Sequence, residues 1–142
     1  SKSAMSKKQS VSLRSLIKLL SVKKVQKKIL SERKNDSSIN CFRIDGESTG
    51  APLPAGNVDL SDIFELGTEN EAISHYATHL MLSTLSQFEE VRTDRLHVAI
   101  GGALIGINVK FYSNNYFKSQ AIYDYSIKGK YPSVDWCSTR SE

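Results

Sequence analysis

The stretch that decides the predicted fold reads RLHVAIGGALIGINVKFY and covers residues 95–112. It contains two runs in which apolar residues alternate with others, and the alternating positions are Leu96, Val98, Ile100, Ile105, Ile107, Val109 and Phe111. Alternation of this kind places apolar side chains on one face of a β-strand. Gly101 and Gly102 stand between the runs, where glycine allows a tight turn. The stretch therefore predicts an antiparallel hairpin, with His97 as a hydrogen-bonded strand histidine.

The sequence after this stretch predicts a third strand. Asn114 and Asn115 favour a turn, because asparagine tolerates left-handed backbone. Apolar residues then alternate again up to the turn at 128–130, at Ala121, Tyr123, Tyr125 and Ile127. A short strand at residues 39–44 is expected to join these three. We therefore expect an antiparallel sheet of three to five strands.

Two helices are expected between the strand at 39–44 and the hairpin. Asp59 begins a short helix that Gly67 ends. Thr68 and Glu71 then match the T-x-x-E capping box and open a longer helix over residues 69–91. Its wide apolar face comprises Ile73, Tyr76, Ala77, Leu80, Met81, Thr84, Phe88 and Val91. The predicted fold class is α+β, with the antiparallel sheet packed on two helices and preceded by a basic, partly helical N-terminal arm.

Positive charge is concentrated in the first 34 residues of the chain. They contain eleven Lys and Arg residues and one acid, Glu32, which gives +10, while the whole chain carries +4. Residues 35–142 therefore sum to −6. A basic arm on a mildly acidic body is typical of proteins that bind a polyanion. The residues expected to make this contact are Lys7, Lys8, Arg14, Lys18, Lys23, Lys24, Lys27, Lys28, Arg33 and Lys34.

Residues 11–30 of the arm contain no glycine or proline and predict helix. The apolar side of this helix changes direction near Ser21, where Leu13, Leu16, Ile17 and Leu20 give way to Val22, Val25 and Ile29. We therefore expect two short amphipathic pieces. The second has closely spaced lysines that repel one another, so we expect an anionic surface to order it.

Three partners can use such an arm: nucleic acid, an anionic membrane or an acidic protein. The arm contains no aromatic residue. It therefore offers no platform for base stacking and favours contact with phosphates or lipid headgroups. A solvated tail or a targeting signal is the plainer alternative.

The 142 residues divide into the arm at residues 1–38 and a single α+β assembly domain at residues 39–142. No apolar run approaches the ~18 residues that a membrane span needs. The first residues do not read as a secretory signal, because lysines interrupt them throughout. Cys41 and Cys137 are the two cysteines, and their number leaves one disulfide or two free thiols open. We expect a reducing, intracellular location.

The sequence contains no pattern that specifies a catalytic or metal site. His75 and His79 are four residues apart with Glu71 one turn earlier, a spacing that zinc accepts, but no third ligand is fixed by spacing. We read these three residues as a solvated helix face. The glycines at 101–106 match neither a dinucleotide fingerprint nor a P-loop, and no nucleophile elbow is present. We expect no metal, no cofactor and no enzyme activity; an enzyme would need His75, His79 or His97 to face a pocket.

The layout of a Lys-rich arm followed by a compact α+β body resembles the matrix proteins of negative-strand RNA viruses, particularly the rhabdovirus type. The segment NCFRIDGE at residues 40–47 is similar to the strand that opens the body in some of that family. The resemblance implies self-association, binding to an anionic membrane, condensation of a nucleocapsid and no enzyme activity.

These observations together predict a non-enzymatic structural or assembly protein of viral matrix type. It would form homo-oligomers and bridge an anionic membrane surface and a nucleocapsid or other protein through its basic arm. Its expected location is the inner face of the membrane in the host cytoplasm, and the virion. The alternative is an RNA-binding protein, such as a small nucleocapsid protein or a silencing suppressor, whose arm follows phosphates.

Overall fold

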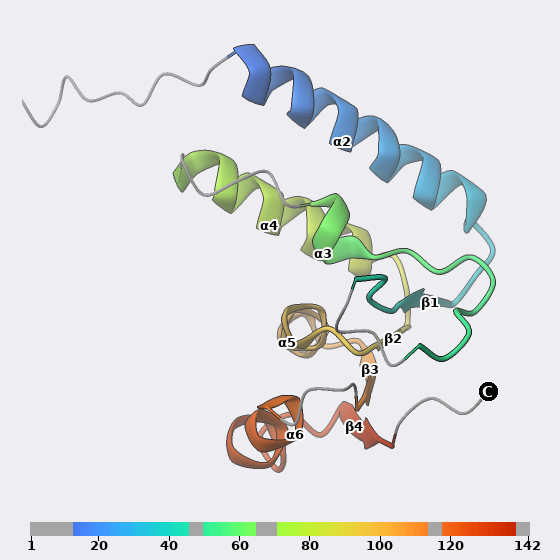
Figure 1. The fold of residues 1–142 in the computed structure, drawn as a ribbon, viewed down its shortest axis with the longest axis vertical. Helices are drawn as coiled ribbons and strands as arrows, with labels where there is room; N and C mark the ends of the chain where they lie inside the picture. The colour runs from blue at the N-terminus through green and yellow to red at the C-terminus, as the bar shows by residue number, and fades with distance from the viewer. Residues whose placement is uncertain (1–12, 46–49, 65–70, 114–117, 139–142) are drawn as a thin grey trace, which may run out of the picture.

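The computed structural model describes residues 13–45, 50–64, 71–113 and 118–138 (Figure 1). Lys2, Lys7 and Lys8 of the predicted arm lie outside these residues, as does the turn at Asn114 and Asn115. The elements in chain order are α2 (Leu13–Glu32), β1 (Ser38–Cys41), α3 (Leu60–Ile63), α4 (Glu71–Leu85), β2 (Glu90–Thr93), α5 (Leu96–Ile105), β3 (Asn108–Tyr112), α6 (Lys118–Ile122), a π-helical turn η1 (Tyr123–Ile127) and β4 (Val134–Cys137).

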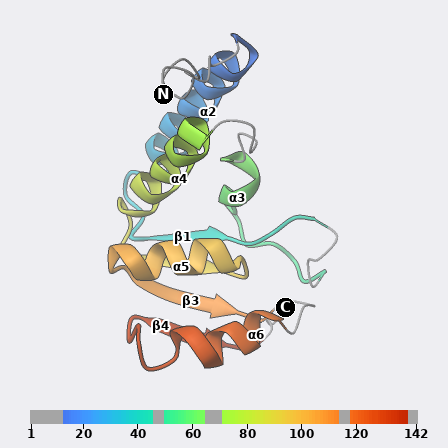
Figure 2. The ribbon, with the colours of Figure 1, turned by 90° about the vertical axis from the view of Figure 1, so that its left-hand side faces the viewer.

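The four strands form one sheet in the order β1-β2-β3-β4, and every neighbouring pair is parallel. Figure 2 shows β1 and β3 pointing in the same direction, with α5 in front of them. The predicted antiparallel sheet is therefore wrong. A two-residue turn can join antiparallel strands only, whereas parallel strands need a crossover that returns the chain to the starting end of the sheet.

The predicted hairpin is replaced by a β2-α5-β3 unit. The first alternating run is α5, and the second supplies β3. Gly101 and Gly102 do not turn the chain; they lie buried in α5, and the helix ends at Gly106, whose φ of 81° is left-handed. The helix has apolar residues on its outer side as well as on its buried side, since Ile100 and Leu104 are 36% and 62% exposed. Apolar residues on all sides of a helix can also satisfy a period of two. That ambiguity explains the wrong prediction.

Close packing against the sheet explains why residue 102 of α5 is glycine. A Cβ atom at this position would lie 2.7 Å from Cγ2 of Val109 and 3.1 Å from Cγ1 of Val91. Both are branched side chains of the sheet, which are stiff about χ1. Glycine therefore lets α5 approach β2 and β3 closely.

The third predicted strand, at 121–127, is also helical. It forms the end of α6 and the turn η1, where the Lys128 N–H donates to the Tyr123 carbonyl at 2.8 Å. This segment is the crossover between β3 and β4. It contacts the sheet through Tyr123, whose ring stacks on that of Trp136 with centroids 5.3 Å apart. Tyr125, expected to alternate inward, is 89% exposed.

The long helix expected over residues 69–91 is shorter than predicted. Helix α4 ends at Leu85, and Val91, assigned to its apolar face, is a fully buried residue of β2. The strand begins where the Glu89 and Glu90 N–H groups donate to the Ser37 carbonyl, at 2.8 and 3.2 Å. Residues 86–88 form a turn after the helix, and pairing with β1 then holds the next residues as a strand.

The two faces of the sheet differ in chemistry. One face packs against helices through the buried residues Ile39, Cys41, Val91, Thr93, Val109, Phe111 and Val134. Figure 1 shows α5 and α6 on the same side of the strands, as right-handed crossovers in this strand order require. The opposite face bears the polar residues Ser38, Asn40, Glu90, Arg92, Asn108, Lys110 and Asp135. A hydrogen bond of 2.5 Å to Asp135 raises the pKa of Lys110 on this face.

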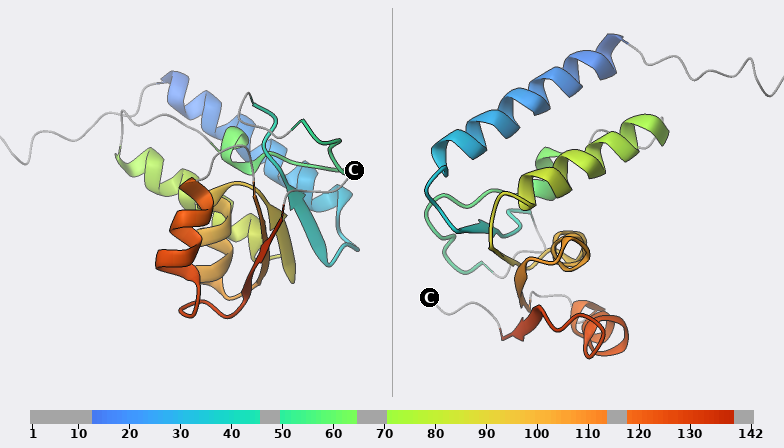
Figure 3. Two further views of the ribbon diagram at one scale, coloured as in Figure 1. Left: turned by 60° about the horizontal axis from the view of Figure 1, so that its bottom comes forward. Right: turned by 180° about the vertical axis from the view of Figure 1, so that it is seen from behind.

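Helix α2 is one continuous helix rather than the two pieces expected. It lies along α4, as Figure 3 shows from behind. Val22 and Ile29 are buried in this contact, and Gln26 Nε2 donates to the Leu80 carbonyl and to the hydroxyls of Ser83 and Thr84 at 2.9–3.3 Å. The contact with α4 therefore orders this helix, whereas we expected an external anionic surface to order its second piece.

The close approach of α5 to the sheet predicts that Gly102→Ala destabilises the protein. The new methyl group meets Val109 and Val91, and overpacking of this kind costs about 1–3 kcal/mol. The control is Gly101→Ala, whose Cβ meets the ends of the flexible side chains of Leu82 and Met81 at 3.0 and 3.4 Å. Urea unfolding should show a clear loss of stability for Gly102→Ala and a smaller change for Gly101→Ala; equal stabilities would contradict this account of the packing.

Candidate functional site at the carboxyl edge of the sheet

The carboxyl ends of parallel strands meet at one edge of the sheet, and charged side chains gather where β1 and β2 end. Arg43 and Asp45 follow β1, and Asp94 and Arg95 follow β2. Asp59, which precedes α3, reaches the same place from a separate loop. The topology therefore brings together five charged residues from three segments of the chain.

Asp59 and Arg95 form the centre of this group. The Arg95 Nε and Nη2 atoms donate to the two carboxylate oxygens of Asp59 at 3.0 and 2.6 Å. The Asp59 side chain is 3% exposed and that of Arg95 is 17% exposed. Asp59 also accepts the Ile44 N–H at 3.2 Å. This bidentate pair holds the Arg95 guanidinium in a fixed orientation.

Asp45 bridges the two arginines. Arg43 donates to its carboxylate through Nε at 2.7 Å and Nη2 at 2.9 Å. Arg95 Nη2 lies 3.3 Å from Asp45 Oδ2. The Asp45 side chain is 44% exposed, whereas that of Arg43 is 12% exposed. A half-exposed carboxylate therefore occupies the position between two oriented guanidinium groups.

Backbone contacts fix the two strand ends against each other. The Thr93 hydroxyl donates to the Cys41 carbonyl at 2.7 Å and accepts the Arg95 N–H at 2.9 Å. Asp94, which is 2% exposed, accepts the Arg43 N–H at 2.8 Å. These bonds place the two arginines by their main chains as well as by their side chains.

Helix α5 starts directly after Arg95, so its N-terminal end faces the same edge. The first N–H groups of a helix have no intrahelical acceptor, and its dipole favours negative charge there. His97, the second residue of α5, is exposed. It is a helix residue and not the strand histidine that the sequence predicts.

The arrangement can bind an anionic group of a small molecule. A carboxylate or phosphate accepts two or more hydrogen bonds from guanidinium groups in the same geometry as Asp45. Arg43, Asp59 and Arg95 were not predicted as site residues, because only parallel strands place the ends of β1 and β2 side by side. The sequence signal that could have indicated this site is the presence of charged residues directly after apolar strands, in the segments CFRID at 41–45 and VRTDRLH at 91–97.

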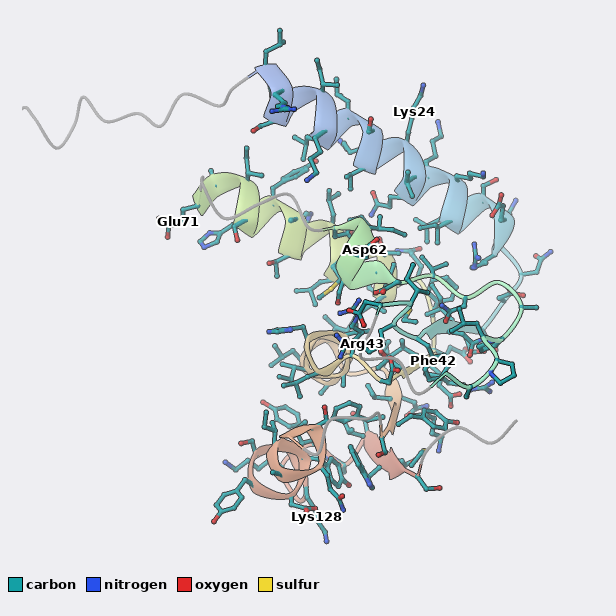
Figure 4. The ribbon with its side chains drawn as sticks, viewed as in Figure 1. Lys24, Phe42, Arg43, Asp62, Glu71 and Lys128 are labelled. Carbon is teal, nitrogen blue, oxygen red and sulfur yellow. The ribbon has the colours of Figure 1, made fainter. Side chains whose placement is uncertain are left out.

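The predicted polyanion-binding residues that the structure describes lie on α2 and just after it. Exposed side chains in this set are Arg14, Lys18, Lys23, Lys24, Lys27, Lys28 and Lys34. Lys23 lies over the Tyr76 ring, with its Nζ atom 5.9 Å from the centroid, and Lys28 is 3.9 Å from Glu32. Lys24 points away from α4 (Figure 4).

Arg33 differs from the other predicted residues because it is used inside the fold. Its Nη2 donates to the Gly56 carbonyl at 2.7 Å, and its Nη1 donates to the Ile29 carbonyl at 3.3 Å. Its side chain is 13% exposed. Arg33 therefore ties the end of α2 to the loop before α3.

The histidine pair of α4 lies on an exposed face. His75 Nε2 is 3.8 Å from Glu71 Oε1, and both side chains are largely exposed. Within the described ranges no group of three or more His, Cys, Asp or Glu side chains is placed to hold a metal ion. The absence of a metal, cofactor or catalytic residue stays a prediction.

Both cysteines are free thiols. Cys41 lies on β1 and Cys137 on β4, with two strands between them. Burial, with a smaller contribution from Asp59, raises the pKa of the Cys41 thiol far above its ordinary value of 9.0. Burial also raises the pKa of the Cys137 thiol. Both thiols are therefore held in the protonated, less reactive form at neutral pH.

The part of the chain that the structure describes contains no helix long and apolar enough to span a bilayer. Helix α2 is long enough, but its lysines and arginines interrupt every apolar window.

Comparison with known proteins identifies no family. No protein-family model matches the chain, and no curated protein matches it. Among solved structures, the chain is similar to the crystal structure of a functionally uncharacterised protein from Klebsiella pneumoniae, with 36% sequence identity and a TM-score of 0.58. The match covers 70% of this chain and 36% of that protein. The chain therefore spans about a third of the bacterial protein.

The central ion pair predicts that Asp59→Asn destabilises the fold. The variant leaves the mostly buried Arg95 guanidinium without its main counter-charge, which costs about 3 kcal/mol. Asp62→Asn is the matched control, because Asp62 lies three residues after Asp59, in α3, with an exposed side chain (Figure 4). Chemical denaturation should show a clear loss of stability for Asp59→Asn and little change for Asp62→Asn. An Asp59→Asn variant as stable as the native protein would show that the ion pair does not support this edge of the sheet.

Proposed function

We propose that the chain is a ligand-binding domain whose carboxyl edge binds a small molecule bearing a carboxylate or phosphate group. The observation that carries the proposal is Asp45, a half-exposed carboxylate held between Arg43 and Arg95. An anionic ligand takes the place of Asp45 and keeps the same hydrogen-bond geometry.

The carboxyl ends of the strands carry loops that are free to vary above a rigid scaffold. The strand order runs in one direction without a reversal, so the charged residues after β1 and β2, and not a topological switch point, mark the position of the site. The loops after β1 and β2 and the start of α5 all lie there. Asp59 and Asp94 are buried and hold the arginines, so exchange of Asp45 leaves the scaffold intact.

The ligand group is an anion because it takes the place of a carboxylate. Two arginines and three aspartates form the group, which sums to −1 in formal charge, so the ligand replaces the charge of Asp45 and does not add to it. Asp59 pairs with Arg95, and Asp45, whose side chain is 44% exposed, pairs with Arg43. Displacement of Asp45 leaves Arg43 without this partner. A neutral ligand does not replace the charge, whereas an anion does.

The test is the effect of Arg43→Gln on anion binding. Inorganic phosphate and pyrophosphate, titrated by calorimetry, should bind the native protein and bind Arg43→Gln about tenfold or more weakly, because a charge-assisted bond is lost. Arg92→Gln is the matched control: Arg92 also pairs with an acid two residues away, Glu90, but lies on the polar face of the sheet. Equal affinity of the two variants, or no binding by the native protein, would exclude the proposed site.

A second function is favoured by the exposed lysines of α2. Leu13–Glu32 contains six basic residues and one acid, and all six basic side chains are exposed. We propose that this surface binds a phosphate-rich partner, either a nucleic acid or an anionic membrane. The resemblance of the sequence to viral matrix proteins extends this second proposal to an assembly role, in which the protein self-associates at the inner face of a membrane.

The second function predicts that Lys24→Gln/Lys27→Gln/Lys28→Gln weakens binding to phosphate-rich partners. The control replaces Lys34, Lys128 and Lys130, which are also exposed and remove the same charge from other parts of the surface. Binding to heparin resin at graded salt should be lost at lower salt for the α2 variant only. Elution of both variants at the same salt concentration would show that net charge alone sets binding to the resin. It would reject α2 as the binding surface.

A further inference from the structure

The side of α2 that faces away from α4 has two chemically different halves. Residues advance by about 100° along an α-helix, which places Leu13, Leu16, Ile17 and Leu20 on one side within two turns. Lys24, Lys27 and Lys28 lie on the same side, nearer the C-terminal end of the helix. The outward face is therefore aliphatic in its N-terminal half and cationic in its C-terminal half. Figure 4 shows Lys24 pointing outward from this face.

The packing of the fold leaves the aliphatic half uncovered. Val22 and Ile29, which lie on the opposite side of the helix, are buried in the core, and Gln26 on the same side donates hydrogen bonds to α4. Leu13, Leu16, Ile17 and Leu20 are 44–74% exposed. The change of apolar side near Ser21 therefore has a structural meaning: one set of residues packs on the protein and the other faces outward.

We infer that the outward face of α2 lies on an anionic lipid bilayer, with the four aliphatic side chains inserted among the headgroups and the three lysines on lipid phosphates. The inference rests on the second proposed function and names its partner. Helices at membrane interfaces combine an apolar surface with Lys and Arg, and they lie in the plane of the membrane. The helix is about 30 Å long, so both halves contact one flat surface together.

Charge and apolarity on one face argue for lipid over nucleic acid. A nucleic acid that contacted Lys24, Lys27 and Lys28 would run its phosphates onto the adjoining aliphatic half, which gains nothing from them. A bilayer offers anionic headgroups and apolar tails side by side. A second copy of this chain fits less well, because pairing of two such faces brings like charges together unless the helices are offset.

The test compares two variants that introduce the same residue type on the same face. One is Leu13→Gln/Leu16→Gln/Ile17→Gln/Leu20→Gln, and the other is Lys24→Gln/Lys27→Gln/Lys28→Gln. All seven side chains are exposed, and glutamine keeps a good helix propensity. Circular dichroism and the thermal midpoint establish that both variants fold as the native chain does.

Flotation with phosphatidylcholine vesicles, with and without phosphatidylserine, and retention of a single-stranded RNA provide the readouts. The native chain should float only with phosphatidylserine present. The aliphatic variant should bind these vesicles about tenfold or more weakly and retain any RNA binding unchanged, while the lysine variant should lose vesicle binding as salt rises.

Three results would overturn the inference. Native-like flotation of the aliphatic variant, together with a loss of flotation by the lysine variant, would show attraction by charge alone, which leaves the second proposed function standing. RNA retention without flotation would assign the face to nucleic acid. A native dimer in light scattering that the aliphatic variant abolishes would assign the face to a second copy. If neither variant changes binding to vesicles or RNA, the second proposed function fails as well.

Discussion

Parallel pairing of β2 with β3 is the constraint on which the structure depends. Two neighbouring parallel strands require the chain to travel back along the sheet between them, so residues 96–105 form a helix. Gly102 then becomes the contact point, because Val109 and Val91 leave no space for a Cβ atom. The same requirement makes α6 and η1 the crossover into β4, although the sequence of that segment alternates like a strand.

The strand order has two consequences for function. The helices α5 and α6 lie on one side of the sheet, which leaves a polar, ion-paired face on the other (Figure 1). The strand ends also meet at one edge, where the buried Asp59 orients Arg95 and the half-exposed Asp45 joins Arg95 to Arg43. A rigid scaffold with one replaceable carboxylate is suited to binding an anionic group, and this suitability supports the first proposed function.

Helix α2 presents a different kind of surface, which the second proposed function assigns to a phosphate-rich partner. Its inward side is held by Gln26, by the buried Val22 and Ile29, and at its end by Arg33. With the helix fixed in this way, its lysines and outward aliphatic residues keep constant positions relative to one another. A preformed helix loses less conformational entropy on docking than a segment that orders on contact.

The sequence by itself determined the elements whose signals are local. Local charge located the exposed basic surface of α2, and apolar patterns located the strand at Ile39 and the helix that starts at Glu71. The predicted cap Thr68 lies outside the residues that the structure describes. The tertiary structure alone decided strand direction, because α5 carries apolar residues on its exposed side, at Ile100 and Leu104, as well as on its buried side. This composition erases the difference between a helical and a strand period. It also decided the candidate site: Asp59 and Arg95 are 36 residues apart in the chain and meet only because parallel strands end together.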